Sequence, residues 1–220
     1  MQARLDSSRL PGKATLPLGG KPIVSRVMEA LNQVPADLRI LACPEDSVSS
    51  LSRPALDAGF EVFAGPKEDV LERFVLAIKK YNLSRVIRAT ADNPFVFADA
   101  AFAINAESAA LGADYAGYAG LPLGAGVEAV SAAALLRAGE KAASLFDREH
   151  VCPYLYSHPE VFKIHRPLSP VRWQADNIRL TIDTPEDYDR ASRIYASLKD
   201  EPFRYHGPAI IRAYKELFQL

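Results

Sequence analysis

The stretch that decides the fold is residues 85–94, Arg-Val-Ile-Arg-Ala-Thr-Ala-Asp-Asn-Pro. A short β-branched run passes directly into a polar turn, the pattern of a buried strand that ends at a sheet edge. Similar runs alternate along the chain with longer segments of helical periodicity. This alternation predicts a single α/β domain with a mostly parallel sheet covered on both faces. The other expected strands are 38–43, 60–64, 114–118, 126–130, 161–164 and 178–182.

Two of the predicted helices have clear start signals. Apolar residues recur at helical spacing from Val70 to Tyr81, after Asp69 with Glu72 three residues on, as in a capping box. The second helix opens with residues 184–187, Thr-Pro-Glu-Asp, which supply an N-cap hydroxyl, a proline at the first helical position and acids near the positive end of the dipole. Their apolar stripes predict core packing and carry no functional assignment.

Composition narrows the class of protein. The 220 residues are 49% apolar and 24% charged with a net charge of −1, so no global field favours nucleic acid or an anionic membrane. Cys43 and Cys152 are too few for a disulfide framework or a zinc set. No apolar run approaches a membrane span, and we expect no leader before the first motif. We expect a cytoplasmic protein without nucleic-acid or membrane partners.

The two ends of the chain carry expectations of their own. Residues 1–3, Met-Gln-Ala, resemble the end of a strand, so we expect a first strand that is cut short. Residues 200–220 are expected to form a C-terminal helical extension of a single domain that spans residues 1–220.

The first motif is a basic loop, residues 2–13, Gln-Ala-Arg-Leu-Asp-Ser-Ser-Arg-Leu-Pro-Gly-Lys, followed by Leu-Gly-Gly-Lys-Pro at 18–22. Its cations are Arg4, Arg9 and Lys13, and Lys21 follows. A triphosphate needs fixed cations and exposed backbone N–H groups in a turn, which Pro11-Gly12 supplies. The spacing is not that of a Walker-type loop. On composition alone, a basic surface loop is the favoured explanation.

Two carboxylates are expected at the sheet edge that binds ligands in open α/β sheets. Asp92 follows the strand at 85–89, and Asp183 follows the run at 178–182. Oxygen ligands there suit Mg²⁺. Asp92 could instead simply cap its own turn. Asp183 is less easily explained by structure, because Thr184 already caps the helix.

A fourth cluster is residues 146–151, Phe-Asp-Arg-Glu-His-Val, with Glu128 upstream. Such a mixture of Arg, Glu and His suits a polyhydroxylated or carboxylate-bearing ligand. The alternative is a solvated helix start with Asp147 as its N-cap.

These motifs, in this order, resemble the cytidylyltransferase family, and within it the spore-coat polysaccharide biosynthesis protein F group, relatives of the CMP-Kdo and CMP-sialic acid synthetases. The similarity extends over residues 2 to about 195. It lies in residues 2–4, 8–13, 18–22, 68–74, 88–94, 147–151 and 180–187. The chain departs from the family pattern at Ala91, Asn93 and the glycine-rich residues 124–126.

The resemblance implies a nucleotide-diphospho-sugar transferase fold, a Rossmann-like, three-layer arrangement with a mixed sheet. It also implies Mg²⁺ as cofactor, CTP and a small acidic sugar as substrates, and a homodimer. By position, Asp92 and Asp183 match the metal ligands, and Arg4, Lys13 and Asp92 match the catalytic set. The expected nucleotide-binding residues are Ala3, Arg4, Ser8, Arg9, Gly12, Lys13, Arg88 and Thr90. The expected sugar-binding residues are Glu128, Arg148 and His150.

The implied reaction is attack of a sugar hydroxyl on the α-phosphorus of CTP, with release of pyrophosphate. One alternative is a glycosyltransferase that consumes a nucleotide-sugar. Its usual Asp-x-Asp occurs here only at residues 187–189, inside an expected helix. A second alternative is a non-catalytic nucleotide- or sugar-binding homologue.

Overall fold

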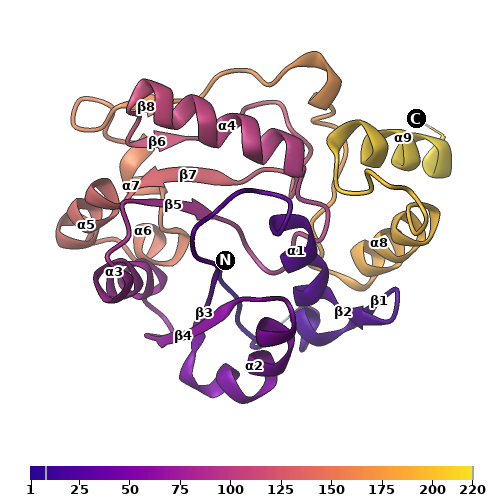
Figure 1. Ribbon diagram of the computed structural model, residues 1–220, viewed down its shortest axis with the longest axis horizontal. Helices are drawn as coiled ribbons and strands as arrows, with labels where there is room; N and C mark the ends of the chain where they lie inside the picture. Colours follow the sequence, from indigo (N-terminus) through magenta and orange to yellow (C-terminus); the bar gives the residue numbers. More distant parts are fainter. Residues whose placement is uncertain (8, 220) are drawn as a thin grey trace.

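The computed structural model describes residues 1–7 and 9–219 and forms a three-layer α/β fold around a mixed sheet (Figure 1). One part of the sheet is the parallel pair β3 (Ile40–Pro44) and β4 (Glu61–Gly65). The other part has the order β5-β7-β6-β8, in which β7 is antiparallel to both neighbours and β8 is parallel to β6. These four strands are Arg85–Arg88, Glu128–Ser131, Tyr115–Ala116 and Ile164–His165.

The N-terminal residues join the two parts of the sheet. Gln2 forms parallel bridges to Ala42 of β3 and to Thr90 just after β5. Its amide donates to the Ala89 carbonyl at 3.0 Å, and the Ala91 amide donates to its carbonyl at 3.0 Å. Figure 1 shows the N-terminus at the centre of the fold, between β3 and β5. Residues 1–3 therefore occupy a central strand position, as their sequence predicts.

Helices cover both faces of the sheet. One face packs against α1 (Ile23–Leu31), α2 (Val48–Asp57) and α4 (Ala98–Leu111). The other face packs against α3 (Val70–Tyr81), α5 (Ala132–Lys141) and α7 (Pro153–Tyr156). The remaining helical segments are η1 (Lys13–Thr15), η2 (Glu45–Ser47), α6 (Leu145–His150), η3 (Val171–Trp173), α8 (Pro185–Ser197) and α9 (Gly207–Phe218). A short hairpin, β1 (Pro17–Leu18) and β2 (Lys21–Pro22), lies beside α8.

Cross-strand register assigns each side chain to one of these two cores. Ile87 of β5 pairs with Ala129 of β7, and both pack into the core of α1 and α4. The preceding residue, Val86, pairs with Val130, and both pack against α3 and α5. Because side chains alternate across a strand, a slip of one residue would exchange the two sets. Burial on both faces therefore fixes the register.

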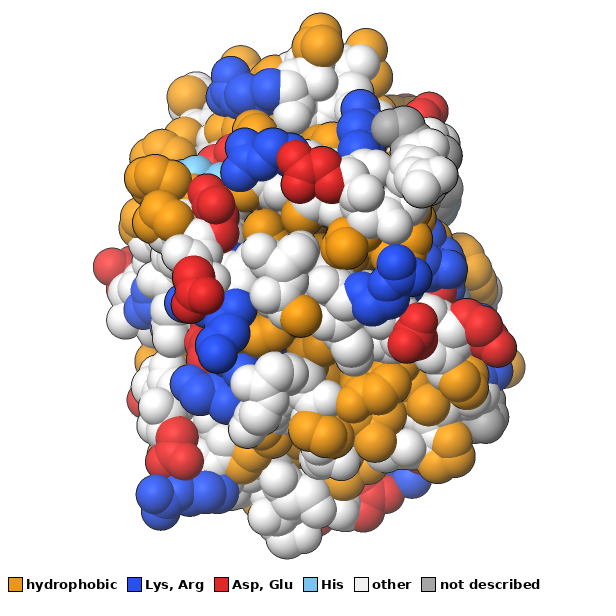
Figure 2. Space-filling model, turned by 90° about the vertical axis from the view of Figure 1, so that its right-hand side faces the viewer, with side chains coloured by type: hydrophobic (Ala, Val, Ile, Leu, Met, Phe, Trp, Pro, Cys, Tyr) orange, Lys and Arg blue, Asp and Glu red, His pale blue; other side chains and the backbone are white. Residues whose placement is uncertain are grey.

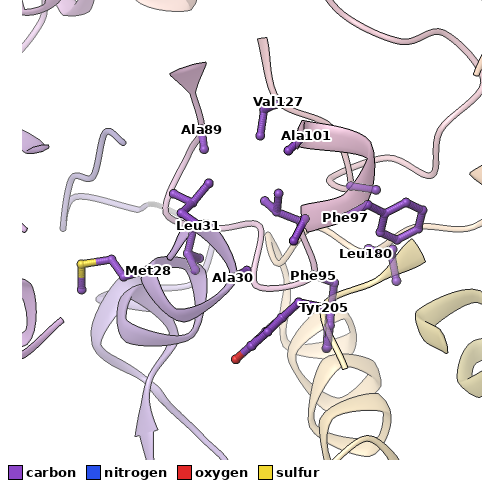
Figure 3. Packing of buried hydrophobic residues seen from close by; sticks show 14 of the residues in the cluster. Met28, Ala30, Leu31, Ala89, Phe95, Phe97, Ala101, Val127, Leu180 and Tyr205 are labelled. Atoms are coloured by element: carbon purple, nitrogen blue, oxygen red, sulfur yellow. The ribbon is translucent and has the colours of Figure 1, made fainter. Parts of the chain in front are cut away.

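The C-terminal segment contributes to the main core. Figure 3 shows Tyr205 beside Phe95, with Leu31 of α1 and Phe97 of the loop before α4 in the same cluster. The Tyr205 hydroxyl donates to Glu29 at 2.7 Å. Ile210 of α9 is fully buried. The segment 200–219, expected as an extension, thus packs against the main core. The expected domain limits stay a prediction.

The helix start signals are confirmed. Helix α3 begins after Asp69, whose carboxylate accepts from the Glu72 amide at 2.9 Å. Helix α8 begins with a full capping box between Thr184 and Asp187. The N-cap of α6 is Ser144, so the expectation that Asp147 caps this helix is wrong. The Ser144 hydroxyl accepts from the Asp147 amide at 3.0 Å.

The strand expected at 178–182 is also wrong as a strand, although its burial pattern is right. Ile178, Leu180 and Ile182 are buried in the main core. The backbone, however, makes only an isolated bridge between Leu123 and Arg179 in the described part of the chain. Alternating apolar residues specify which side chains are buried. A strand also requires a neighbouring strand in register with which its backbone can form hydrogen bonds.

No helix of the described residues is long and apolar enough to cross a membrane. Figure 2 shows Lys, Arg, Asp and Glu side chains interspersed among apolar ones on the face turned to the viewer. This mixture agrees with the net charge of −1.

Gly124 gives a test of how closely the loop 121–126 must approach residues 180–181. Its φ is +92°, and a Cβ there would lie 2.6 Å from the Thr181 backbone nitrogen. Gly20 has a similar φ of +84° with open space around it. We expect Gly20→Ala to cost about 1 kcal/mol from backbone strain alone. We expect Gly124→Ala to cost about 3 kcal/mol, because the contact adds to the strain.

Urea unfolding of both variants and the wild type measures these costs. Equal losses for the two variants would show that the loop can move away from Thr181 without penalty.

Candidate active site

The basic loop leaves the sheet after Ala3, on the edge where β3, β4 and β5 end. Gly12 ends its tight turn with a φ of +66°, and Lys13 begins the 3₁₀ helix η1. The Lys13 amide donates to the Leu10 carbonyl at 3.2 Å. Positive φ is the reason for a glycine at this point. The turn directs the side chain of Lys13 towards the end of β5.

Lys13 is the centre of the site. Its ammonium nitrogen lies 2.8 Å from Oδ2 of Asp92 and 3.0 Å from Oδ1 of Asp183. The Ile182 carbonyl accepts a third hydrogen bond at 3.1 Å. The Lys13 side chain is only 15% exposed. Three oxygens from two distant parts of the chain therefore converge on one positive charge.

Asp92 is held by its own turn. The Thr90 hydroxyl donates to Asp92 Oδ1 at 2.6 Å, and the side-chain amide of Asn93 donates to the Thr90 hydroxyl at 2.8 Å. The turn thus uses one carboxylate oxygen, while the other oxygen faces Lys13. The turn and the contact with Lys13 thus use different oxygens of Asp92, and its role as a metal ligand stays a prediction.

Asp183 is brought to Asp92 by the backbone and surrounded by cations. The Ile182 amide donates to the Asp92 carbonyl at 2.9 Å, which places residues 182–183 beside the end of β5. Arg9 lies 3.2 Å from Asp183 Oδ1, and Arg179 donates to Oδ2 at 2.7 Å. Burial raises the pKa of Asp183, but Lys13, Arg9 and Arg179 outweigh it and lower the pKa below its usual value.

Arg179 and Asp187 hold Asp183 in place. This role of Arg179 was not among the predictions from the sequence. Arg179 Nε donates to Asp187 at 2.9 Å. Asp187 also accepts from the Asp183 amide at 3.0 Å and from Arg190 at 2.7 Å. The signal was present in the sequence as Arg179 four residues before Asp183 and eight before Asp187. These bonds fix the position of Asp183.

The oxygens around Lys13 fit a hard divalent cation. Mg²⁺ in proteins is bound through one or two carboxylates, with waters and substrate phosphates completing its shell. Asp92 Oδ2 and Asp183 Oδ1 already face a common cation position within 3.0 Å of each. Among the described residues no group of three or more His, Cys, Asp and Glu could hold a metal alone. A cation here would therefore depend on further ligands such as phosphate oxygens.

The other cations expected to bind nucleotide lie at the same edge or beside it. Arg4 is about half exposed and pairs with Glu149 at 3.2 Å and with Asp6 at 3.8 Å. Arg88 of β5 is more buried and is paired with Glu128 of β7. Ser8 lies outside the described residues. The nucleotide-binding roles of these residues and of Ala3, Arg9, Gly12 and Thr90 stay predictions.

The three residues expected to bind a sugar make separate contacts. Glu128 pairs with Arg88 and accepts from the Tyr115 hydroxyl at 3.1 Å. Burial, followed by the charge of Glu128, raises the pKa of Tyr115, so this hydroxyl is a donor over the physiological range. The His150 ring packs against the Phe146 ring at an interplanar angle of 55° on the exposed helix α6. The contacts of Arg148 differ from those of both Glu128 and His150.

Arg148 connects helices. Its Nε donates to Asp69 at 2.6 Å, and its Nη1 donates to the carbonyls of Gly139 and Ala142 at 2.9 and 3.1 Å. It therefore joins the start of α3 to the end of α5. Its assignment to a sugar, like those of Glu128 and His150, stays a prediction.

A cavity of about 440 Å³ lies away from this site. It runs between β3 and β5 from Met1 along Ile40 and residues 85–87. Its walls carry neither Lys13 nor the two aspartates. The chemistry of the chain is therefore concentrated at the carboxyl edge of the strands, as expected for an open α/β sheet.

A family model, described as cytidylyltransferase, matches residues 1–210. The chain belongs to the cytidylyltransferase family. It is a nucleotidyltransferase, which confirms the class of enzyme inferred from the ordered motifs. The family fold also confirms the expected nucleotide-sugar transferase architecture with its mixed sheet. The glycosyltransferase and non-catalytic readings are set aside accordingly, and residues 187–189 do lie within α8.

A relative in sequence agrees with this membership, and two solved structures share the fold. The chain is 35% identical to the spore coat polysaccharide biosynthesis protein SpsF of Bacillus subtilis, over 92% of this chain and 87% of that protein. A cytidylyltransferase structure from Leptospira borgpetersenii superposes with a TM-score of 0.88 at 24% identity, covering 98% of this chain and 92% of the other. A CMP:2-keto-3-deoxy-manno-octonic acid synthetase complexed with CTP superposes with a TM-score of 0.63 at 16% identity, covering 89% and 96%.

Asp187 gives a pH-dependent test of the support beneath this cytidylyltransferase site. Burial raises its pKa, but hydrogen bonds from Arg179, the Asp183 amide and Arg190 lower it to about 2. Because the folded-state pKa lies below the unfolded value of 3.8, its stabilisation is complete above about pH 4 and is lost as the pH falls towards 2. We expect Asp187→Asn to cost about 2 kcal/mol at pH 7.

Urea unfolding of Asp187→Asn and the wild type at pH 7, 5, 4 and 3 measures this cost. The difference in unfolding free energy between the two proteins should become smaller below pH 4. A constant difference over the whole pH range would contradict the lowered pKa of Asp187.

Proposed function

We propose that this enzyme joins CTP to an acidic sugar to give a CMP-sugar and pyrophosphate, for the synthesis of a surface polysaccharide. The observation that carries the proposal is the convergence of Lys13, Asp92 and Asp183 at the carboxyl edge of the sheet. Support for the pathway comes from the similarity to SpsF, a spore coat polysaccharide biosynthesis protein. Support for CTP and a sugar acid comes from the family and from the fold shared with the CTP-bound synthetase.

In this proposal the chain's residues position the nucleotide and offset its charge. Nucleotidyl transfer depends mostly on in-line positioning and on neutralising charge. The exposed guanidinium groups of Arg4 and Arg9 are free to turn towards the phosphates at the rim of the site. Lys13 and the turn at Gly12 bring a cation and backbone N–H groups to the leaving pyrophosphate. Asp92 and Asp183 would hold Mg²⁺, which would supply positive charge to the nucleotide phosphates.

The sugar acid is proposed to bind on the side of β7 and α6. Glu128 and Tyr115 offer an acceptor and a donor for hydroxyl groups, and Arg88 offers a charge for a carboxylate. Arg88 Nε is buried without a hydrogen-bond partner among the described residues, so one donor remains for a ligand or a water. Arg148 and His150 complete the proposed sugar-binding set. Arg148 is proposed to act indirectly, by holding α6 in position through its bond to the Gly139 carbonyl.

We further propose that the enzyme works in the cytoplasm, where CTP is available, and that it forms a homodimer. Nucleic acid and membranes are not proposed as partners, in keeping with the net charge of −1.

Asp92→Asn tests the chemistry directly. We expect the variant to fold normally and to lose at least about 1,000-fold in turnover, because its amide cannot hold a cation beside the α-phosphate. Pyrophosphate release from CTP in the presence of Mg²⁺ and a panel of sugar acids, including 3-deoxy-manno-octulosonate, is the measurement.

Asp189→Asn is the matched control, because it makes the same change at an exposed carboxylate of α8. It should retain wild-type turnover. Full activity in Asp92→Asn would remove Asp92 from the proposed metal site.

A thermal-shift panel tests the nucleotide. CTP, other nucleoside triphosphates, CMP-sugars and UDP-sugars are each added with and without Mg²⁺. A ligand present at 100 times its dissociation constant adds about 2.7 kcal/mol of stability, which is a shift of several degrees for a domain of this size. We expect the largest shift from CTP with Mg²⁺. A shift with UDP-sugars alone would overturn the proposal.

A further inference from the structure

The feature that extends the proposed site is the position of the Lys13 ammonium group. It lies between the two carboxylate oxygens that face a common cation, at 2.8 Å from Asp92 and 3.0 Å from Asp183. With the Ile182 carbonyl at 3.1 Å, its three N–H groups have three acceptors. The lysine thus fills the place of a divalent cation, with oxygens as its neighbours.

We propose that Lys13 is an internal counter-ion which keeps a divalent cation out of the site until a triphosphate draws the lysine away. This inference rests on the proposed function and adds how its two ligands are coupled. A divalent cation cannot share the position, because two positive centres about 3 Å apart repel strongly and would compete for the same oxygens. Cation and nucleotide then bind together, each favouring the other.

The charges around the two carboxylates support this coupling. Asp92 and Asp183 are faced by three cations, Lys13, Arg9 and Arg179. Asp187, which pairs with Arg179, is also faced by Arg190, so four cations stand against three carboxylates in this cluster. Without phosphate the site therefore carries an excess of positive charge, which disfavours a further cation. A triphosphate reverses the sign of the local charge, so a divalent cation becomes favourable once the nucleotide has arrived.

The three cations differ in their freedom to move. Arg179 is held by Asp187 through both Nε and Nη2, at 2.9 and 3.1 Å. It therefore stays on Asp183 Oδ2. The contacts of Lys13 are all to the cation site itself, and Arg9 is 65% exposed. Movement of Lys13 and Arg9 to phosphate oxygens would free Asp92 Oδ2 and Asp183 Oδ1 together.

The test is direct binding of Mn²⁺, a paramagnetic substitute for Mg²⁺, to the protein without nucleotide or sugar. The intensity of the free Mn²⁺ electron paramagnetic resonance signal gives the dissociation constant. We expect weak binding to the wild type and at least about tenfold tighter binding to Lys13→Met and Lys13→Gln. Lys13→Arg, which keeps the charge, should bind as weakly as the wild type.

Lys21→Met is the matched control for net charge, because Lys21 pairs with Glu29 at 2.7 Å instead of with the site carboxylates. It should bind Mn²⁺ like the wild type. Adding Asp183→Asn to Lys13→Met should abolish the gain, which shows that the tighter binding uses the site. Thermal melting of each variant confirms that it is folded.

Two results would overturn the proposal. One is Mn²⁺ binding to the wild type as tight as to the neutral Lys13 variants, and the other is a gain in Lys13→Met that survives Asp183→Asn. Failure of the proposed function has a different signature, namely no pyrophosphate release from CTP by the wild type. The Mn²⁺ titration contains no CTP and is independent of that outcome.

Discussion

The interaction on which the rest of the structure depends is the double pairing of Gln2. Gln2 exchanges hydrogen bonds with residues 89 and 91 after β5, while its neighbours Met1 and Ala3 bond to Ala42 of β3, so residues 1–3 join the two parts of the sheet. Because both bridges are parallel, the ends of β3, β4 and β5 lie at one edge. The basic loop begins at that edge directly after Ala3. Assembly of the sheet therefore also places the cations of this loop at that edge.

A second constraint fixes the acids of the site. The Ile182 amide bonds to the Asp92 carbonyl, and the close approach at Gly124 keeps the loop 121–126 against residues 180–181. Asp187 then holds both Arg179 and the Asp183 backbone. Asp183 thus has rigid support on one side and Lys13 on the other, and the proposed exchange of Lys13 for a divalent cation would leave that support in place.

The sites that were predicted best are those whose chemistry is local. Helix starts at Asp69 and Thr184 follow from side chains within three residues of the backbone that they cap. The convergence of Lys13 with Asp92 and Asp183 depends on a sheet that brings together residues up to 170 positions apart. The ordered family motifs indicated those residues, but not that the lysine fills the cation position. The connecting role of Arg148 was missed because its partners come from α3 and from residues 139–142.

The sequence by itself determined the class of fold, the enzyme family and the cationic and acidic residues at the sheet edge. It could do so because hydrophobic periodicity and capping are local, and because the motifs keep their order along the chain. Tertiary structure alone decided that 178–182 is not a strand, that residues 205–214 belong to the main core, and that Lys13 pairs with both aspartates. Each of these depends on partners far apart in the chain, which only the packed sheet and its helices bring together.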